Sequence, residues 1–142
     1  MVDRLPDTPH GHLAETYPAV PESISRARTA VSALAAQAGA GADALDAVRL
    51  ATSEAVTNAV LYAYGDDVGP IHISATVTDR GLSVTVADEG DGVRPRLDRK
   101  GIGIGLAVIA EAADELAISS RPAGGTELQM SFGGWARAAN AA

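Results

Sequence analysis

Apolar residues recur every three or four positions in residues 21–38 and again in residues 43–65. Pro21 suits the first turn of the first helix, and Gly39 suits its end. Asp43 is a suitable cap at the start of the second helix. Each segment has one apolar face. The pattern therefore predicts two amphipathic helices that pack against a common core.

Further along, the chain changes to a period of two, which is typical of β-strands with one buried face. Residues 71–78 and 82–86 alternate in this way on either side of the turn Asp79-Arg80-Gly81, so they predict an antiparallel hairpin. The other expected elements are a strand at 13–20, a helix at 106–115, and strands at 117–120 and 126–132.

Together these elements predict an α/β protein of the α+β kind. Three helices can cover only one side of a sheet whose other face is polar. We therefore expect a two-layer sandwich, with three helices on one face of a mixed, mostly antiparallel sheet. A length of 142 residues suits one domain. We assign it residues 13–135, with tails at 1–12 and 136–142.

Composition narrows the choice of partners. The net charge of −7 argues against direct binding to nucleic acid, because a basic surface is needed to displace counterions from phosphates. No apolar stretch is long enough to span a bilayer, and residues 1–12 lack the pattern of a signal peptide. The chain has no cysteine, which excludes disulfides. We expect a cytoplasmic protein whose partner is a small ligand or another protein.

Glu54 and Asn58 are the first candidates for chemistry. They lie four residues apart on the second helix, so their side chains can converge on one ligand. A neutral amide oxygen from Asn58 can bind Mg²⁺ when a triphosphate supplies most of the negative charge. Glu54 can then act as a general base. Taken alone, the pair favours the solvated face of an amphipathic helix, and it is the other motifs that favour a ligand site.

Asp88 follows a strand with an apolar face and begins the turn Asp88-Glu89-Gly90-Asp91-Gly92. A carboxylate at this position can accept a hydrogen bond from the exocyclic amine of adenine. Gly90 and Gly92 allow the backbone to bend tightly beneath a flat base. An ordinary polar turn after a strand would have a similar composition.

The glycine run Gly101-Ile102-Gly103-Ile104-Gly105-Leu106 stands directly before the predicted third helix. Free amides at a helix start bind anions, and glycines let phosphate oxygens approach. A dinucleotide-binding fingerprint would need a preceding strand, and the Gly-Lys-Ser/Thr of a Walker loop does not occur. Residues 93–100 hold four of the chain's eleven Lys and Arg, with Arg99 and Lys100 nearest the glycines. These cations can neutralise phosphate.

In this order and spacing, and with Gly125-Thr126 near the end, the three motifs resemble the nucleotide site of the GHKL superfamily, which includes histidine kinases and DNA gyrase. The sequences around Glu54 and Asp88, and the upstream sequence Ala27-Arg28-Thr29, are most similar to those of the bacterial anti-sigma-factor serine kinases. The resemblance implies a Bergerat-type fold, ATP and Mg²⁺ as ligands, and a sigma factor and a STAS-type anti-anti-sigma factor as partners. It also admits a homodimer.

The resemblance also implies roles for individual residues. Glu54 would be the catalytic base, Asn58 the Mg²⁺ ligand and Asp88 the adenine anchor. Thr126 would make a second contact near the base, and Arg28, or alternatively Arg26, would bind partners. The phosphate loop would comprise Gly101, Gly103, Gly105 and Leu106.

Two departures from the family pattern leave alternatives open. The segment between Gly92 and Gly101 has only eight residues, which is short for the family and favours a module that binds ATP without transferring phosphate. No histidine-bearing helix precedes the domain, so the chain does not match a complete sensor kinase. A third hypothesis is a switch kinase that activates a phosphatase.

Overall fold

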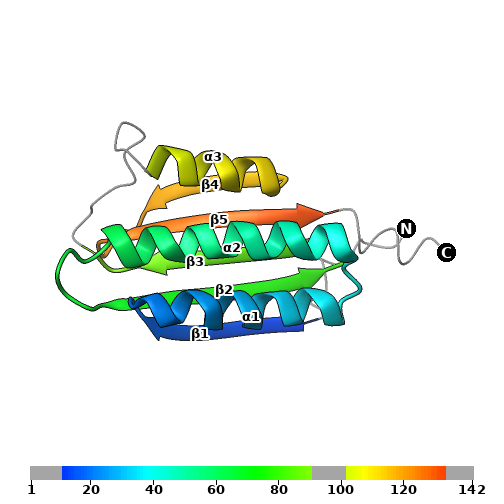
Figure 1. Ribbon diagram of the computed structural model, residues 1–142, viewed down its shortest axis with the longest axis horizontal. Helices are drawn as coiled ribbons and strands as arrows, with labels where there is room; N and C mark the ends of the chain where they lie inside the picture. Colours follow the sequence, from blue (N-terminus) through cyan, green and yellow to red (C-terminus); the bar gives the residue numbers. More distant parts are fainter. Residues whose placement is uncertain (1–10, 91–101, 134–142) are drawn as a thin grey trace, which may run out of the picture.

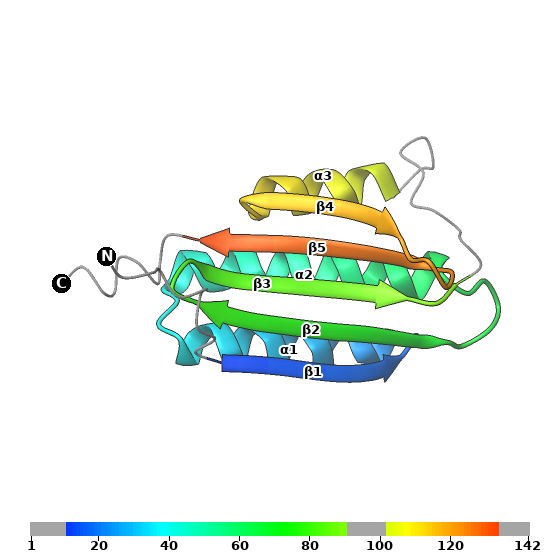
Figure 2. The same cartoon turned by 180° about the vertical axis from the view of Figure 1, so that it is seen from behind.

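The computed structural model describes residues 11–90 and 102–133 of the protein. Its elements follow the chain in the order β1 (Gly11–Pro18), α1 (Pro21–Gln37), α2 (Ala42–Tyr62), β2 (Pro70–Thr78), β3 (Gly81–Asp88), α3 (Ile102–Ala112), β4 (Glu115–Ser120) and β5 (Thr126–Gly133). The strands form one sheet in the order β1-β2-β3-β5-β4. The described helices cover one face of this sheet (Figure 1), and the other face is open (Figure 2).

The predicted two-layer sandwich is thus confirmed, with one correction to the sheet. We expected some parallel pairing, but every pair of neighbouring strands among the described residues is antiparallel. Between β1 and β2 the chain runs out along α1 and back along α2, so β2 enters in the direction opposite to β1 (Figure 1). Hairpins join β2 to β3 and β4 to β5, and the chain passes from β3 through α3 to β4.

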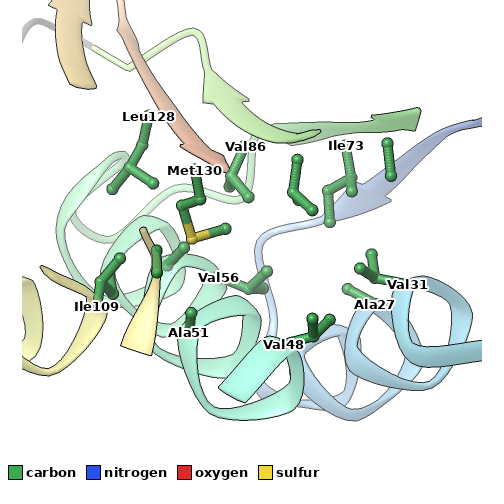
Figure 3. Packing of buried hydrophobic residues seen from close by; sticks show 14 of the residues in the cluster. Ala27, Val31, Val48, Ala51, Val56, Ile73, Val86, Ile109, Leu128 and Met130 are labelled. Carbon is green, nitrogen blue, oxygen red and sulfur yellow. The ribbon is translucent and has the colours of Figure 1, made fainter. Parts of the chain in front are cut away.

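The hydrophobic core lies between the helices and the sheet (Figure 3). Alternate residues of β2, β3 and β5 point into it, as their period of two predicts. Ile73 is almost fully buried there, and Val84 and Met130 are fully buried. Small residues such as Ala27 and Ala51 on the facing helices let the two layers approach closely.

Several boundaries differ from those predicted. The first strand begins at Gly11 rather than residue 13, because Gly11 and His12 pair with Val77 and Thr76 through backbone groups that need no apolar side chain. The cap of α2 is Gly41 instead of Asp43, which lies in the first turn. The fourth strand begins at Glu115, two residues early. No helix within residues 11–90 or 102–133 is long and apolar enough to cross a membrane.

The predicted hairpin between β2 and β3 is confirmed. Thr78 pairs with Gly81, which leaves Asp79 and Arg80 as the two-residue turn. Gly81 has a φ of +132°, a conformation that favours glycine. A Cβ at this position would lie 2.1 Å from the carbonyl oxygen of Phe132 on β5. The hairpin delivers Asp88 to the end of β3 that lies beside the end of α2 (Figure 2).

Candidate functional site

Glu54 and Asn58 face the first turn of α3. Gly105 packs against both of them: a Cβ at Gly105 would lie 3.2 Å from Glu54 Oε2 and 3.3 Å from Asn58 Oδ1. Both side chains are half-buried. The two side chains therefore lie together against Gly105 of the glycine run, and their convergence on a ligand stays a prediction.

Asn58 has an unpaired polar atom. Its Nδ2 is buried and has no hydrogen-bond partner in the described part of the chain. A buried amide group without a partner costs about 1–3 kcal/mol of stability. The group can present its oxygen in place of its nitrogen by rotating about χ2. A bound cation or polar ligand beside Gly105 would give this amide the partner that it lacks.

The glycine run differs from prediction. We expected a loop up to Gly105 and a helix from Leu106, whereas α3 begins at Ile102. The free N–H groups at the helix start therefore belong to residues 102–104, which include Gly103. Leu106 is 5% exposed, and its side chain joins the hydrophobic core.

Asp88 ends β3 with its carboxylate already partly engaged. Its Oδ1 accepts hydrogen bonds from the backbone N–H groups of Gly90, at 3.0 Å, and Thr126, at 3.3 Å. Both of these hydrogen bonds use the same oxygen, so Oδ2 is the atom that can face a ligand. Thr126 was predicted to lie near this site, and the structure brings its backbone to Asp88.

Gly90 is required by close packing against the end of α2. A Cβ at Gly90 would lie 2.0 Å from the carbonyl oxygen of Ala63, the residue that caps α2. No ordinary side chain fits at that distance, so only glycine allows the turn after Asp88 to rest on the helix that carries Asn58. The close contact of Gly90 is with protein backbone, and the predicted bend beneath a base stays a prediction.

Two residues that the sequence analysis missed lie against the Asp88 turn. The Tyr64 hydroxyl accepts a hydrogen bond from the backbone N–H of Glu89 at 2.7 Å, and Arg121 Nη1 donates to the carbonyl oxygen of Asp88 at 3.1 Å. No periodicity or motif marks either residue. Only the proximity of segments 25 and 33 residues apart in the chain brings them to the site.

Arg28 was expected on an exposed partner surface. It is half-buried, and its Nη1 donates to the Ser53 hydroxyl across the interface of α1 and α2 at 3.4 Å. The guanidinium therefore lies beside the residue that precedes Glu54. Arg26, the alternative match, is exposed and stacks 5.4 Å from the centroid of the Tyr17 ring.

Some predicted site residues lie outside the described residues. These are Gly92, Arg99, Lys100 and Gly101, together with the rest of the basic segment 93–100. The site that can be described consists of the Glu54–Asn58 face, the start of α3 and the Asp88 turn. This arrangement fits a nucleotide, because it combines an amide and a carboxylate on a helix, free amides at a helix start and a carboxylate able to bind an amine.

A site of this kind beside an antiparallel sheet defines the class of the protein. The chain belongs to the histidine kinase-like ATPase domain family, whose model matches residues 17–132. The predicted GHKL-type fold is confirmed.

The chain is also similar to individual proteins of this family. The chain is 35% identical over 120 residues to an anti-sigma F factor of Caldanaerobacter subterraneus subsp. tengcongensis, a match that covers 77% of this chain and 84% of the relative. It is 30% identical over 128 residues to the anti-sigma F factor of Bacillus subtilis, covering 80% and 86%. The chain is also similar to the crystal structure of the RsbU and RsbW domains of Rv1364c from Mycobacterium tuberculosis, with a TM-score of 0.69 and 27% identity. That match covers 87% of this chain but 32% of the solved chain.

Proposed function

We propose that the protein is an anti-sigma factor and an ATP- and Mg²⁺-dependent serine kinase. It sequesters a sigma factor and phosphorylates a serine of a STAS-type anti-anti-sigma factor, whose unphosphorylated form releases the sigma factor. The observation that carries the kinase assignment is the contact of Gly105 with both Glu54 and Asn58. The names of the relatives support the sigma factor as a partner. We place this activity in the cytoplasm.

Each element of the site has one task in the proposal. Asp88 binds the exocyclic amine of adenine through Oδ2, the N–H groups at the start of α3 bind phosphate oxygens, and the amide of Asn58 holds Mg²⁺. A Mg²⁺ ion held there would supply positive charge to offset the charge that develops on the phosphates. Glu54 accepts the proton of the attacking serine hydroxyl as the new O–P bond forms and the bond to the ADP oxygen breaks.

Gly105→Ala should separate stability from nucleotide binding. The added Cβ would lie 3.2–3.3 Å from Glu54 Oε2 and Asn58 Oδ1, so these side chains must shift by a few tenths of an ångström. Alanine is about 1 kcal/mol better than glycine within a helix, which offsets the crowding in the free protein. We expect an unchanged or higher melting temperature and about tenfold weaker binding of Mg²⁺–ATP, or about 1.4 kcal/mol.

Calorimetric titration and a thermal melt measure the two quantities. Gly41→Ala is the matched control, because a Cβ at Gly41 meets nothing within 4 Å at the other end of α2. If Gly105→Ala binds Mg²⁺–ATP as tightly as Gly41→Ala does, the Gly105 contact is not part of the nucleotide site.

Arg28→Ala should weaken capture of the sigma factor or its antagonist about tenfold, because a charged hydrogen bond to a partner contributes about 1.5–3 kcal/mol. Nucleotide affinity should stay unchanged. Ser53→Ala is the control, since it removes the same 3.4 Å contact between α1 and α2 but keeps the guanidinium. A pull-down with purified partners measures capture. Equal loss in both variants would mean that Arg28 acts only by joining the helices.

A further inference from the structure

The peptide bond between Asp88 and Glu89 is held from both sides. Its N–H donates to the Tyr64 hydroxyl at 2.7 Å, and its carbonyl oxygen accepts from Arg121 Nη1 at 3.1 Å. Tyr64 follows the end of α2, whereas Arg121 follows β4. Two segments that are distant in sequence therefore fix the plane of one peptide group, the one directly after the predicted adenine anchor.

Tyr64 is itself held firmly. Its hydroxyl donates to the carbonyl oxygen of Pro70 at 2.5 Å, and a Cβ at Gly69 would lie 2.2 Å from the tyrosine ring. Burial raises the pKa of Tyr64, so the hydroxyl keeps its proton well above neutral pH. The hydroxyl can thus donate to Pro70 and accept from Glu89 at once.

The turn that carries Arg121 is equally well defined. The Arg121 N–H donates to the carbonyl oxygen of Gly125, and the Gly124 N–H donates to that of Arg121, both at 3.0 Å. Gly125 has a φ of +106°, and a Cβ there would lie 2.0 Å from the carbonyl oxygen of Asp88. The turn therefore packs against the same carbonyl oxygen that Arg121 binds.

We propose that Tyr64 and Arg121 are positioning residues that set the preference for adenine by fixing the Asp88–Glu89 peptide. Since Asp88 Oδ1 is bound to the N–H groups of Gly90 and Thr126, the direction of Oδ2 depends on the orientation of the adjoining backbone. The inference rests on the proposed nucleotide function and adds the residues that determine base selectivity.

The test compares the affinities of the full chain for ATP and inosine triphosphate, each with Mg²⁺. Inosine carries a carbonyl oxygen where adenine carries the amine, so it offers Asp88 no donor at that position. Tyr64 and Arg121, with their hydrogen bonds to the Asp88–Glu89 peptide, form a clamp on that peptide. Tyr64→Phe and Arg121→Met each remove one of these two hydrogen bonds and keep most of the side-chain volume. A hydrogen bond contributes about 1 kcal/mol, so each variant should reduce the ratio of ATP to inosine triphosphate affinity about fivefold. The ratio is insensitive to the fraction of unfolded protein, because unfolding weakens both ligands equally.

Tyr17→Phe is the matched control. The Tyr17 hydroxyl donates to the Glu15 side chain on β1, and burial, followed by that bond, raises the pKa of Tyr17 to about 12. Removing the Tyr17 hydroxyl should leave the ratio of ATP to inosine triphosphate affinity unchanged. If wild type prefers ATP and both clamp variants keep that preference, the positioning role is overturned while the nucleotide site stands. If wild type shows no preference, or binds neither nucleotide, the assignment of Asp88 fails and the clamp has no function.

Discussion

Glu54→Gln should slow phosphoryl transfer to the antagonist serine by about 10²–10⁴-fold, the usual contribution of a general base. Glutamine keeps the shape and reach of the side chain beside Gly105 but cannot take up the serine proton. Binding of Mg²⁺–ATP should change little, because Asn58, the start of α3 and the Asp88 turn are intact. A fall in rate with unchanged affinity is the signature of an interaction made only in the transition state.

The measurement is single-turnover transfer of labelled phosphate, with calorimetry for affinity. Glu111→Gln serves as the control, because Glu111 is an exposed glutamate on α3 and not part of the proposed site. It makes the same change of net charge. Rapid transfer by Glu54→Gln would remove Glu54 from catalysis. A proportional loss of ATP affinity would instead give Glu54 a role in binding.

Asp88→Asn should weaken ATP binding by about 100-fold, close to the 3 kcal/mol upper range for a hydrogen bond to a charged group. Asparagine can keep an oxygen in the place of Oδ1 and so retain the bonds from Gly90 and Thr126. The amino group then replaces Oδ2 and meets the amine of adenine donor to donor. Stability should therefore change little, unlike in Asp88→Ala, which would also leave the N–H groups of Gly90 and Thr126 without their acceptor.

Asp114→Asn is the control for this substitution. Asp114 Oδ2 accepts a hydrogen bond from the Gly133 N–H at 2.6 Å, so it too is an aspartate that binds backbone. That variant should bind ATP normally. Calorimetry in which Asp88→Asn retains wild-type affinity would refute the base pocket.

The sheet was the most predictable part of the fold. Residues 71–78 of β2 and 82–86 of β3 alternate between apolar and polar side chains, and a two-residue turn joins the strands, so both register and buried face follow from the sequence. The start of β1 was missed, because a strand at the edge of a sheet can begin with residues such as Gly11 and His12 that bury no apolar side chain.

The start of α3 was missed for a different reason. Glycine is a poor helix former, so a run with three glycines predicts a loop. In the structure Gly105 belongs to the helix, where the absence of a side chain lets the helix approach Glu54 and Asn58. The conformation of the run depends on a contact with α2 that no local pattern reveals.

The site also contains some residues that the sequence marks and others that it does not. Glu54 and Asn58 were predictable from helical spacing, and Asp88 from its place at a strand end. Tyr64 and Arg121 were not, since they act through hydrogen bonds to backbone atoms of a distant turn. Backbone atoms are the same in every residue, so such contacts leave no pattern in the sequence.

The proposed activity of this site is the transfer of a phosphoryl group from ATP to a serine on an antagonist of the anti-sigma factor. Its most direct test is the intact mass of a purified STAS-type antagonist after incubation with the chain, ATP and Mg²⁺, followed by peptide mapping. We predict the addition of one phosphoryl group on a serine, and none with EDTA present. An antagonist of unchanged mass, under conditions in which it binds the chain and the chain binds ATP, would contradict the kinase assignment.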